Sequence, residues 1–114
     1  MLDNSARGRV WLAERDGRLV GCTAIALRPG RVGQLRWVLV EPSARGIGLG
    51  RRLVETAIAF SIEAGCDRLY LETTDGLPES QSLYENLGFA VVSSETQVLW
   101  EDERPLIRME KRLA

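Results

Sequence analysis

The sequence predicts an α+β domain in which a mixed, largely antiparallel and twisted sheet carries helices on both of its faces. Two observations lead to this fold class. Three β-rich runs separated by turn residues fill the first forty residues, as in an antiparallel meander. A strand–helix–strand pattern follows them in the middle of the chain, and further β-rich segments lie near its end.

The N-terminal runs span Val10 to Glu14, Leu19 to Leu27 and Val32 to Val40. Asp16-Gly17 separates the first two runs, and an Asp-Gly pair between β-rich segments is a strong signal of a two-residue hairpin turn. Pro29-Gly30 marks a second turn before the third run. These segments are therefore predicted to pair as neighbouring antiparallel strands.

From Leu49 onward, apolar residues recur at steps of three and four, which is the period of one face of an α-helix. Gly65 follows this stripe in the position typical of a helix C-terminal cap. The segment is therefore predicted to be an amphipathic helix that packs on the sheet. Its apolar residues are Leu53, Val54, Ala57, Ile58, Phe60 and Ala64.

A short apolar strand, Leu69 to Leu71, is predicted after this helix and is extended by Glu72 and Thr73. Pro78 favours the first turn of a second helix, because its fixed φ suits that position and its missing N–H is not needed there. Gly88 ends this helix. The middle of the chain is thus predicted to be a strand followed by a short helix.

Two last strands are predicted, from Ala90 to Val92 and from Leu106 to Met109. The segment between them, Ser93 to Arg104, contains Trp100 and several charged residues, and it is predicted to be a mobile surface loop. Trp11 and Trp37 are predicted to be core aromatic residues.

Composition limits the classes of protein to consider. The 114 residues suit one domain, residues 1–114, with a single core. The formal net charge of −1 does not predict a nucleic-acid or membrane surface. Both cysteines are interpreted as small apolar core residues of a reducing compartment, so a cytoplasmic location is expected. The chain has no histidine, and Cys22 and Cys66 lack the spacing of metal ligands, so no metal is expected.

The most informative motif is the string Arg45-Gly46-Ile47-Gly48-Leu49-Gly50, which lies between a predicted strand and a predicted helix. The first turn of a helix leaves N–H groups without partners and attracts negative charge, and glycine allows the backbone to approach a ligand closely. The string is not a P-loop, because Arg51-Arg52 follows it where Lys-Ser or Lys-Thr is needed. Nor does it match the dinucleotide fingerprint, because position 51 is not glycine.

The pattern Arg-x-x-Gly-x-Gly, formed by Arg45, Gly48 and Gly50, instead resembles the acyl-CoA pyrophosphate loop of the GNAT N-acetyltransferase superfamily. The preceding Val38-Leu39-Val40-Glu41-Pro42 resembles the fourth strand of that family. About forty residues downstream, Leu83-Tyr84-Glu85-Asn86-Leu87-Gly88-Phe89 resembles its C-terminal signature. The resemblance covers most of the chain, from about Val10 to Leu113.

This resemblance implies a GNAT-like acyltransferase fold and acetyl-CoA as the acyl donor. The loop would hold the pyrophosphate through its backbone amides, and the preceding strand would pair with the pantetheine arm as an added strand pairs with a sheet edge. That strand and the one beginning at Arg68 would splay apart to admit the thioester. The implied cofactor-binding residues are Val38, Leu39, Val40, Arg45, Gly46, Ile47, Gly48, Leu49, Gly50 and Arg51.

Tyr84 is the candidate general acid, because it matches the tyrosine of the family signature and a phenol is protonated at neutral pH. A half-buried structural tyrosine is the alternative. Glu72 is the first candidate for a general base and Glu41 the second. A water relay, or no dedicated base, also stays open because the chain lacks histidine.

The chain is short at its N-terminus, since about eight residues precede the first predicted strand where the family has a strand and two helices. A short natural variant, a piece of a longer polypeptide or a homodimer would each account for this. The predicted activity is transfer of an acetyl group to a small-molecule or peptide amine by direct attack. The alternatives are a regulatory domain that binds acyl-CoA without turnover and a structural domain without a ligand. The sequence does not identify the amine.

Overall fold

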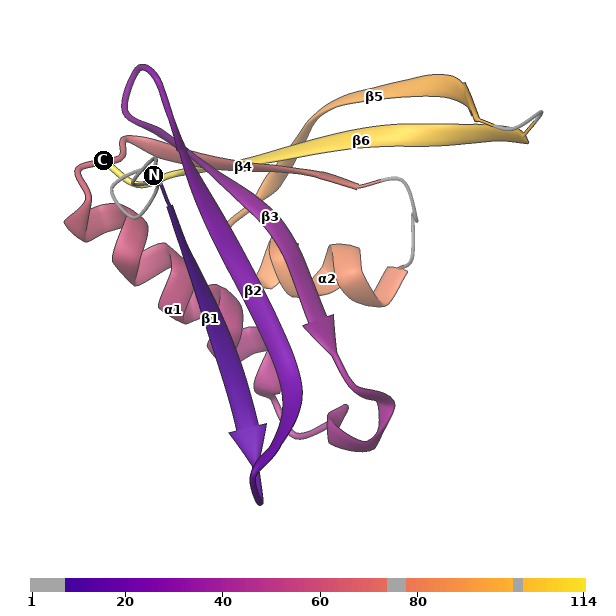
Figure 1. Cartoon of the computed structure of the whole chain (residues 1–114). Helices are drawn as coiled ribbons and strands as arrows, with labels where there is room; N and C mark the ends of the chain where they lie inside the picture. The colour runs from indigo at the N-terminus through magenta and orange to yellow at the C-terminus, as the bar shows by residue number, and fades with distance from the viewer. Residues whose placement is uncertain (1–7, 74–77, 100–101) are drawn as a thin grey trace, which may run out of the picture.

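The computed structural model describes residues 8–73, 78–99 and 102–114. Six strands form one sheet in the order β1-β2-β3-β4-β6-β5, and β3 and β4 are its only parallel neighbours among the described strands (Figure 1). The elements in chain order are β1 Gly8–Arg15, β2 Arg18–Arg28, β3 Val32–Val40, η2 Pro42–Ala44, α1 Leu49–Glu63, β4 Arg68–Thr73, α2 Pro78–Asn86, β5 Ala90–Leu99 and β6 Asp102–Arg112.

The predicted meander is confirmed, because β1 pairs with β2 and β2 with β3, both antiparallel. Asp16 and Gly17 join the first two strands with φ of 54° and 76°. Positive φ at both central residues matches the turn that suits the right-handed twist of a hairpin. Gly65, with φ of 85°, follows α1 as expected and donates its N–H to the carbonyl of Ile62 at 3.0 Å.

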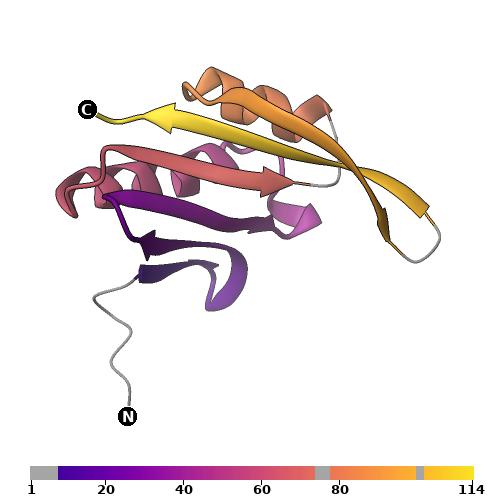
Figure 2. The same cartoon turned by 90° about the horizontal axis from the view of Figure 1, so that it is seen from above.

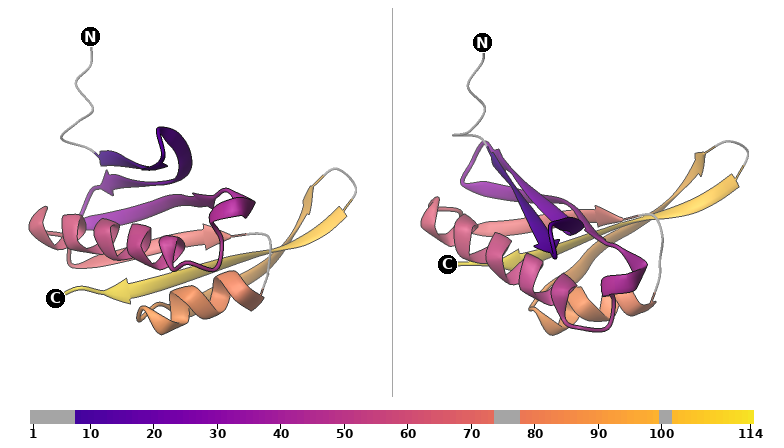
Figure 3. Two further views of the ribbon diagram at one scale, coloured as in Figure 1. Left: turned by 90° about the horizontal axis from the view of Figure 1, so that it is seen from below. Right: turned by 60° about the horizontal axis from the view of Figure 1, so that its bottom comes forward.

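Both helices lie on the same face of the sheet, so the expectation of helices on both faces is wrong for the described residues (Figure 3). Val54 of α1 belongs to one core cluster with Leu69 of β4 and Met109 of β6, and Leu83 of α2 packs against that same cluster. The two apolar stripes therefore pack against one core instead of sandwiching the sheet. No helix among the described residues is long and apolar enough to cross a membrane.

The segment Ser93 to Arg104, predicted as a mobile loop, instead forms most of an antiparallel hairpin. The described residues of β5 and β6 pair in register from Ser93↔Arg108 to Leu99↔Asp102. Figure 2 shows this hairpin extending past the end of β4. The prediction failed because paired backbone groups stabilise a two-stranded ribbon even where the sequence is polar and shows no clear alternation. Trp100 lies outside the described residues.

Strands β3 and β4 pair only near their beginnings, at Val32↔Arg68, Gly33↔Leu69 and Gln34↔Tyr70. The remainder of β3, residues 35–40, and the remainder of β4, residues 71–73, have no ladder between them. The expected splay of these two strands is therefore confirmed. We call this unpaired region the splay.

A β-bulge at Arg36 sets the direction in which the end of β3 faces. Its neighbours Leu35 and Trp37 pair with Ile25 and Ala24, so Arg36 is the extra residue. Side chains three residues apart in a regular strand lie on opposite faces of the sheet. The extra residue at the bulge instead places Val38 on the same face as Leu35, where both pack in the core against the helices. Trp37, predicted to be a core residue, is instead 40% exposed on the other face. Trp11 packs edge-on against Phe60 of α1 at 5.2 Å, as a core aromatic should.

Candidate active site

The glycine loop between β3 and α1 is fixed at its start and open at its end. Ala44, at the end of η2, is fully buried and donates its N–H to the carbonyl of Glu41 at 2.9 Å. Arg45 reaches back from the loop and donates from Nε to the carbonyl of Val40 at 3.2 Å. Gly46 and Gly48 adopt φ of 83° and 79°, and nothing lies within 4 Å of a Cβ built at either position. Backbone conformation, and not crowding, therefore requires glycine there.

The loop presents a row of backbone amides with no protein partner. Helix α1 begins after Gly48, which makes no side-chain cap. Its first internal bond runs from the Arg52 amide to the Gly48 carbonyl at 3.1 Å. In the part of the chain that the structure describes, no backbone amide from Gly46 to Arg51 donates to another protein group. These amides, at the positive end of a helix dipole, are suited to binding an anion.

A pocket of about 410 Å³ lies over this loop, and we call it the loop pocket. It lies between the first turns of two helices, because Leu49 to Arg51 begin α1 and Ser80 belongs to the first turn of α2. The positive ends of both dipoles therefore act on it. Its volume is within the range of ligand sites. Its lining residues are Val38, Val40, Ala44, Arg45, Gly46, Gly48, Leu49, Gly50, Arg51, Ser80, Leu83 and Tyr84.

Tyr84 belongs to α2 and lines the loop pocket together with the glycine loop. Its half-buried ring packs edge-on against Phe89, with ring centroids 5.9 Å apart. Its carbonyl accepts hydrogen bonds from the amides of Leu87 and Phe89, at 3.1 and 2.9 Å. Since Phe89 is only 3% exposed, the core fixes the position of Tyr84 at the pocket.

The remaining predicted residues lie away from the loop pocket. Leu39 and Ile47 are each 59% exposed and do not line it. Glu72 is exposed on the face of β4 away from the helices, two residues beyond the last β3–β4 pair and opposite Arg108. Glu41 forms an ion pair with Arg18, and its Oε2 is buried with no hydrogen-bond partner. The sequence did not point to Ala44 or Ser80.

The strand side of the site is open as well. Beyond Gln34, the edge of β3 that faces β4 has no ladder partner, so its backbone groups, apart from the Val40 carbonyl that accepts from Arg45, are available to an extended ligand. Together, the free amides, the two helix N-termini and the open strand edge fit an elongated ligand with a phosphate group. The fold and the site thus define an α+β domain with an open helix start and strand edge that suit a phosphate-bearing ligand.

Comparison with known proteins gives the family. Residues 2–89 match the model of the acetyltransferase (GNAT) family. The mycothiol acetyltransferase of Thermomonospora curvata is 38% identical over 80 residues, which are 70% of this chain and 27% of that protein. The chain therefore belongs to the GNAT acetyltransferase family.

Solved structures agree with this assignment. The ribosomal-protein-alanine N-acetyltransferase of Brucella melitensis superposes with a TM-score of 0.81 at 30% identity, over 91% of this chain and 68% of that one. The acetyltransferase yncA of Salmonella typhimurium, solved with its cofactor acetyl-CoA, shares the fold with a TM-score of 0.84 at 23% identity, over 96% of this chain and 66% of that one. The chain spans about half or less of the length of the first curated relatives it matches.

Proposed function

We propose that residues 1–114 form a single domain that transfers an acetyl group from acetyl-CoA to a primary amine by direct attack in a ternary complex. The observation that carries this proposal is the row of unbonded amides from Gly46 to Arg51, beside a strand that leaves its neighbour at the splay. The amides would hold the pyrophosphate of the donor and the free edge of β3 its pantetheine arm. Ile47 would contribute only its backbone groups, whereas the backbone groups of Leu39 pair with Cys22 of β2 and would not contact the donor.

Tyr84 would act as the general acid. As the amine nitrogen bonds to the thioester carbonyl carbon and the carbon–sulfur bond breaks, the phenol would give its proton to the departing thiolate. Its place on the wall of the loop pocket supports this role.

The test of this role is Tyr84→Phe, measured by release of free thiol from acetyl-CoA with a panel of amines. The rate of turnover should fall by roughly 100-fold while the dissociation constant of acetyl-CoA stays within about twofold. Tyr70→Phe is the matched control, because Tyr70 is the other tyrosine of the chain and its ring lies under Arg108, away from the loop pocket. An unchanged rate in Tyr84→Phe would remove the phenol from the mechanism.

Glu72 would be the general base. The loop pocket lies on the helix face, whereas Glu72 lies on the opposite face at the edge of the splay. An amine that approaches from that opposite face would meet Glu72 before it reached the thioester. Glu72→Gln should lower turnover more strongly at low pH than at high pH, where more of the free amine is already unprotonated. An identical loss at every pH, or no loss, would exclude this role, and Glu63→Gln at the exposed end of α1 is the control.

The acceptor is proposed to be a small-molecule or peptide amine. Among the relatives described above, one is named for mycothiol and one for the alanine of a ribosomal protein. A second copy of the chain in a homodimer would complete the acceptor side. A cytoplasmic location is proposed because both cysteines are free thiols, as is usual in reducing compartments.

A second candidate function is binding of acyl-CoA without turnover, as in a sensor or regulatory domain. One observation favours it: neither Glu72 nor Glu41 lines the loop pocket. Thermal denaturation with acetyl-CoA and thiol release distinguish the two, because a ligand of the native state raises the melting temperature whether or not it reacts. Stabilisation without thiol release across the amine panel would select the binding function.

A further inference from the structure

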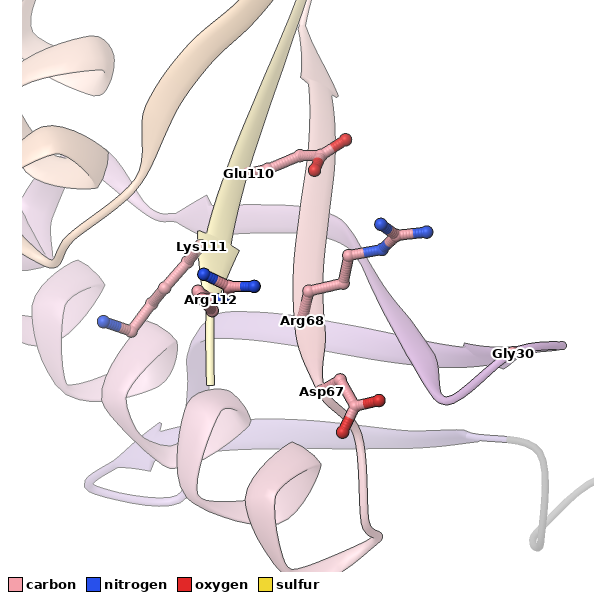
Figure 4. A pocket seen from close by; sticks show the side chains of 6 residues that line it. All are labelled: Gly30, Asp67, Arg68, Glu110, Lys111 and Arg112. Atoms are coloured by element: carbon pink, nitrogen blue, oxygen red, sulfur yellow. The ribbon is translucent and has the colours of Figure 1, made fainter. Parts of the chain in front are cut away.

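A second pocket, of about 560 Å³, lies where β4 begins and β6 ends. It shares no residue with the loop pocket, and the 15-residue helix α1, about 22 Å long, separates the two. We call it the arginine pocket. Its lining residues are Gly30, Asp67, Arg68, Glu110, Lys111 and Arg112 (Figure 4).

Two arginines stand opposite each other in this pocket. Arg68 and Arg112 are direct cross-strand partners of β4 and β6, so their side chains leave the same face of the sheet. Figure 4 shows Lys111 pointing the other way, toward the helices. Like charges at directly opposed positions destabilise a sheet. An anion between the two guanidinium groups would remove that cost.

The nearby carboxylates do not neutralise this pair. Asp67 forms an ion pair with Arg31 at 3.3 Å, and Glu110 forms one with Arg108 at 3.0 Å. Within residues 8–73, 78–99 and 102–114, the side chains of Arg68 and Arg112 make no hydrogen bond and no ion pair. Both guanidinium groups therefore keep their charge and their donors.

A third arginine extends the positive charge across the same face. Arg28 pairs in register with Val32, which pairs with Arg68, so the three residues form one row across β2, β3 and β4. Two nitrogens of Arg28 donate to the side-chain oxygen of Gln34, at 3.0 and 2.6 Å. Because an amide is neutral, this contact orients Arg28 without cancelling its charge.

The backbone under the pocket is fixed. The Asp67 amide donates to the carbonyl of Arg31, and the Leu113 amide donates to the carbonyl of Asp67, both at 2.7 Å. Arg31 also donates from Nε to the carbonyl of Gly65 at 2.9 Å. The start of β4, the end of β6 and the turn before β3 are thus tied together, which gives a rigid base for a binding site.

We propose that the arginine pocket binds a phosphate group, either free or carried by a small phosphorylated molecule. Planar guanidinium groups match the oxygens of phosphate and bind it by paired, charge-assisted hydrogen bonds. The rim at Gly30 bears no side chain to obstruct such a ligand. This site does not depend on the proposed acetyl transfer, and a chain that failed to bind acetyl-CoA would leave it unchanged.

The test is an NMR titration of the ¹⁵N-labelled chain with inorganic phosphate and, separately, with glycerol 3-phosphate, at constant ionic strength. Saturable shifts are expected at the amides of Arg68, Lys111 and Arg112. This readout also locates the ligand, since binding at the glycine loop would shift residues 46–51 instead. Tighter binding of glycerol 3-phosphate than of phosphate would indicate a phosphorylated molecule as the ligand, and equal binding would indicate phosphate alone.

The double variant Arg68→Gln with Arg112→Gln should weaken this binding by at least about 100-fold, or roughly tenfold for each lost charge-assisted hydrogen bond. Arg15→Gln is the control, because Arg15 is exposed on the β1–β2 hairpin and its substitution also removes one positive charge. Shifts confined to residues 46–51, shifts that do not saturate, or equal weakening in the control would each overturn the proposal. Binding of an oligonucleotide but of neither phosphate compound would also overturn it.

Discussion

Replacing glycine by alanine just before and just inside the start of α1, at Gly48 and at Gly50, should have opposite effects on stability. Gly48 has φ of 79°, in the left-handed region where a Cβ is strained. The strain is about 1 to 2 kcal/mol, partly offset because alanine also restricts the unfolded chain. We therefore expect Gly48→Ala to lower the free energy of unfolding by about 1 kcal/mol.

Gly50 lies in the first turn of α1, where alanine is the better helix former. A Cβ built there would lie 3.6 Å from Cδ2 of Leu83 and 3.9 Å from Cγ2 of Val40, which are ordinary contact distances. Gly50→Ala should therefore raise the free energy of unfolding by about 0.5 kcal/mol. For a chain of this length, the two variants should differ in melting temperature by about 6 °C.

The assays are urea and thermal unfolding, together with calorimetric titration of acetyl-CoA. Gly50→Ala should bind acetyl-CoA within about threefold of the wild type, because its N–H stays in place. Gly48→Ala should bind roughly tenfold more weakly, since relieving its strain turns at least one amide away from the ligand. If the two variants melted at the same temperature, the argument from backbone conformation would be refuted.

Three buried residues, Thr23, Leu69 and Cys66, give further predictions. Thr23→Val keeps the shape of a fully buried side chain but removes the 2.6 Å hydrogen bond that Thr23 Oγ1 donates to the Trp37 carbonyl. Urea unfolding should show a free energy of unfolding lower by about 1 to 3 kcal/mol. A decrease below about 0.5 kcal/mol would mean that this bond does not stabilise the bulge. Leu69→Ala, at a side chain with no exposed surface, should lower the free energy of unfolding by about 3 to 5 kcal/mol. Leu19→Ala, the control at an exposed site, should lower it by less than about 1 kcal/mol. Burial raises the pKa of the Cys66 thiol above its ordinary value of 9.0, so the folded state disfavours the thiolate and stability should fall as pH rises through 9. Cys66→Ala should remove that part of the pH dependence, and an unchanged slope would contradict it.

Much of the secondary structure could be predicted because its signals are local. The Asp16-Gly17 turn, the periodicity of α1 and the proline at the start of α2 each depend on residues close together in the sequence. The phosphate-loop motif is local in the same way, and two of its three glycines, Gly46 and Gly48, adopt the positive φ that such a turn needs. The strands from Ala90 and from Leu106 were predicted, but the extension of β5 beyond Val92 and of β6 before Leu106 was missed, because strand pairing brings together residues whose own sequence is polar.

The sequence by itself determined the order of the elements, the family resemblance and the loop whose amides can bind an anion. Tertiary structure alone decided that both helices share one face and that the bulge at Arg36 turns Val38 toward the helix face and Trp37 away from it. It also decided that Arg68 and Arg112 stand opposite each other. The reason is physical: a turn or a helix start depends on dihedral angles of adjacent residues, whereas strand register and the choice of face depend on packing between segments far apart in the chain.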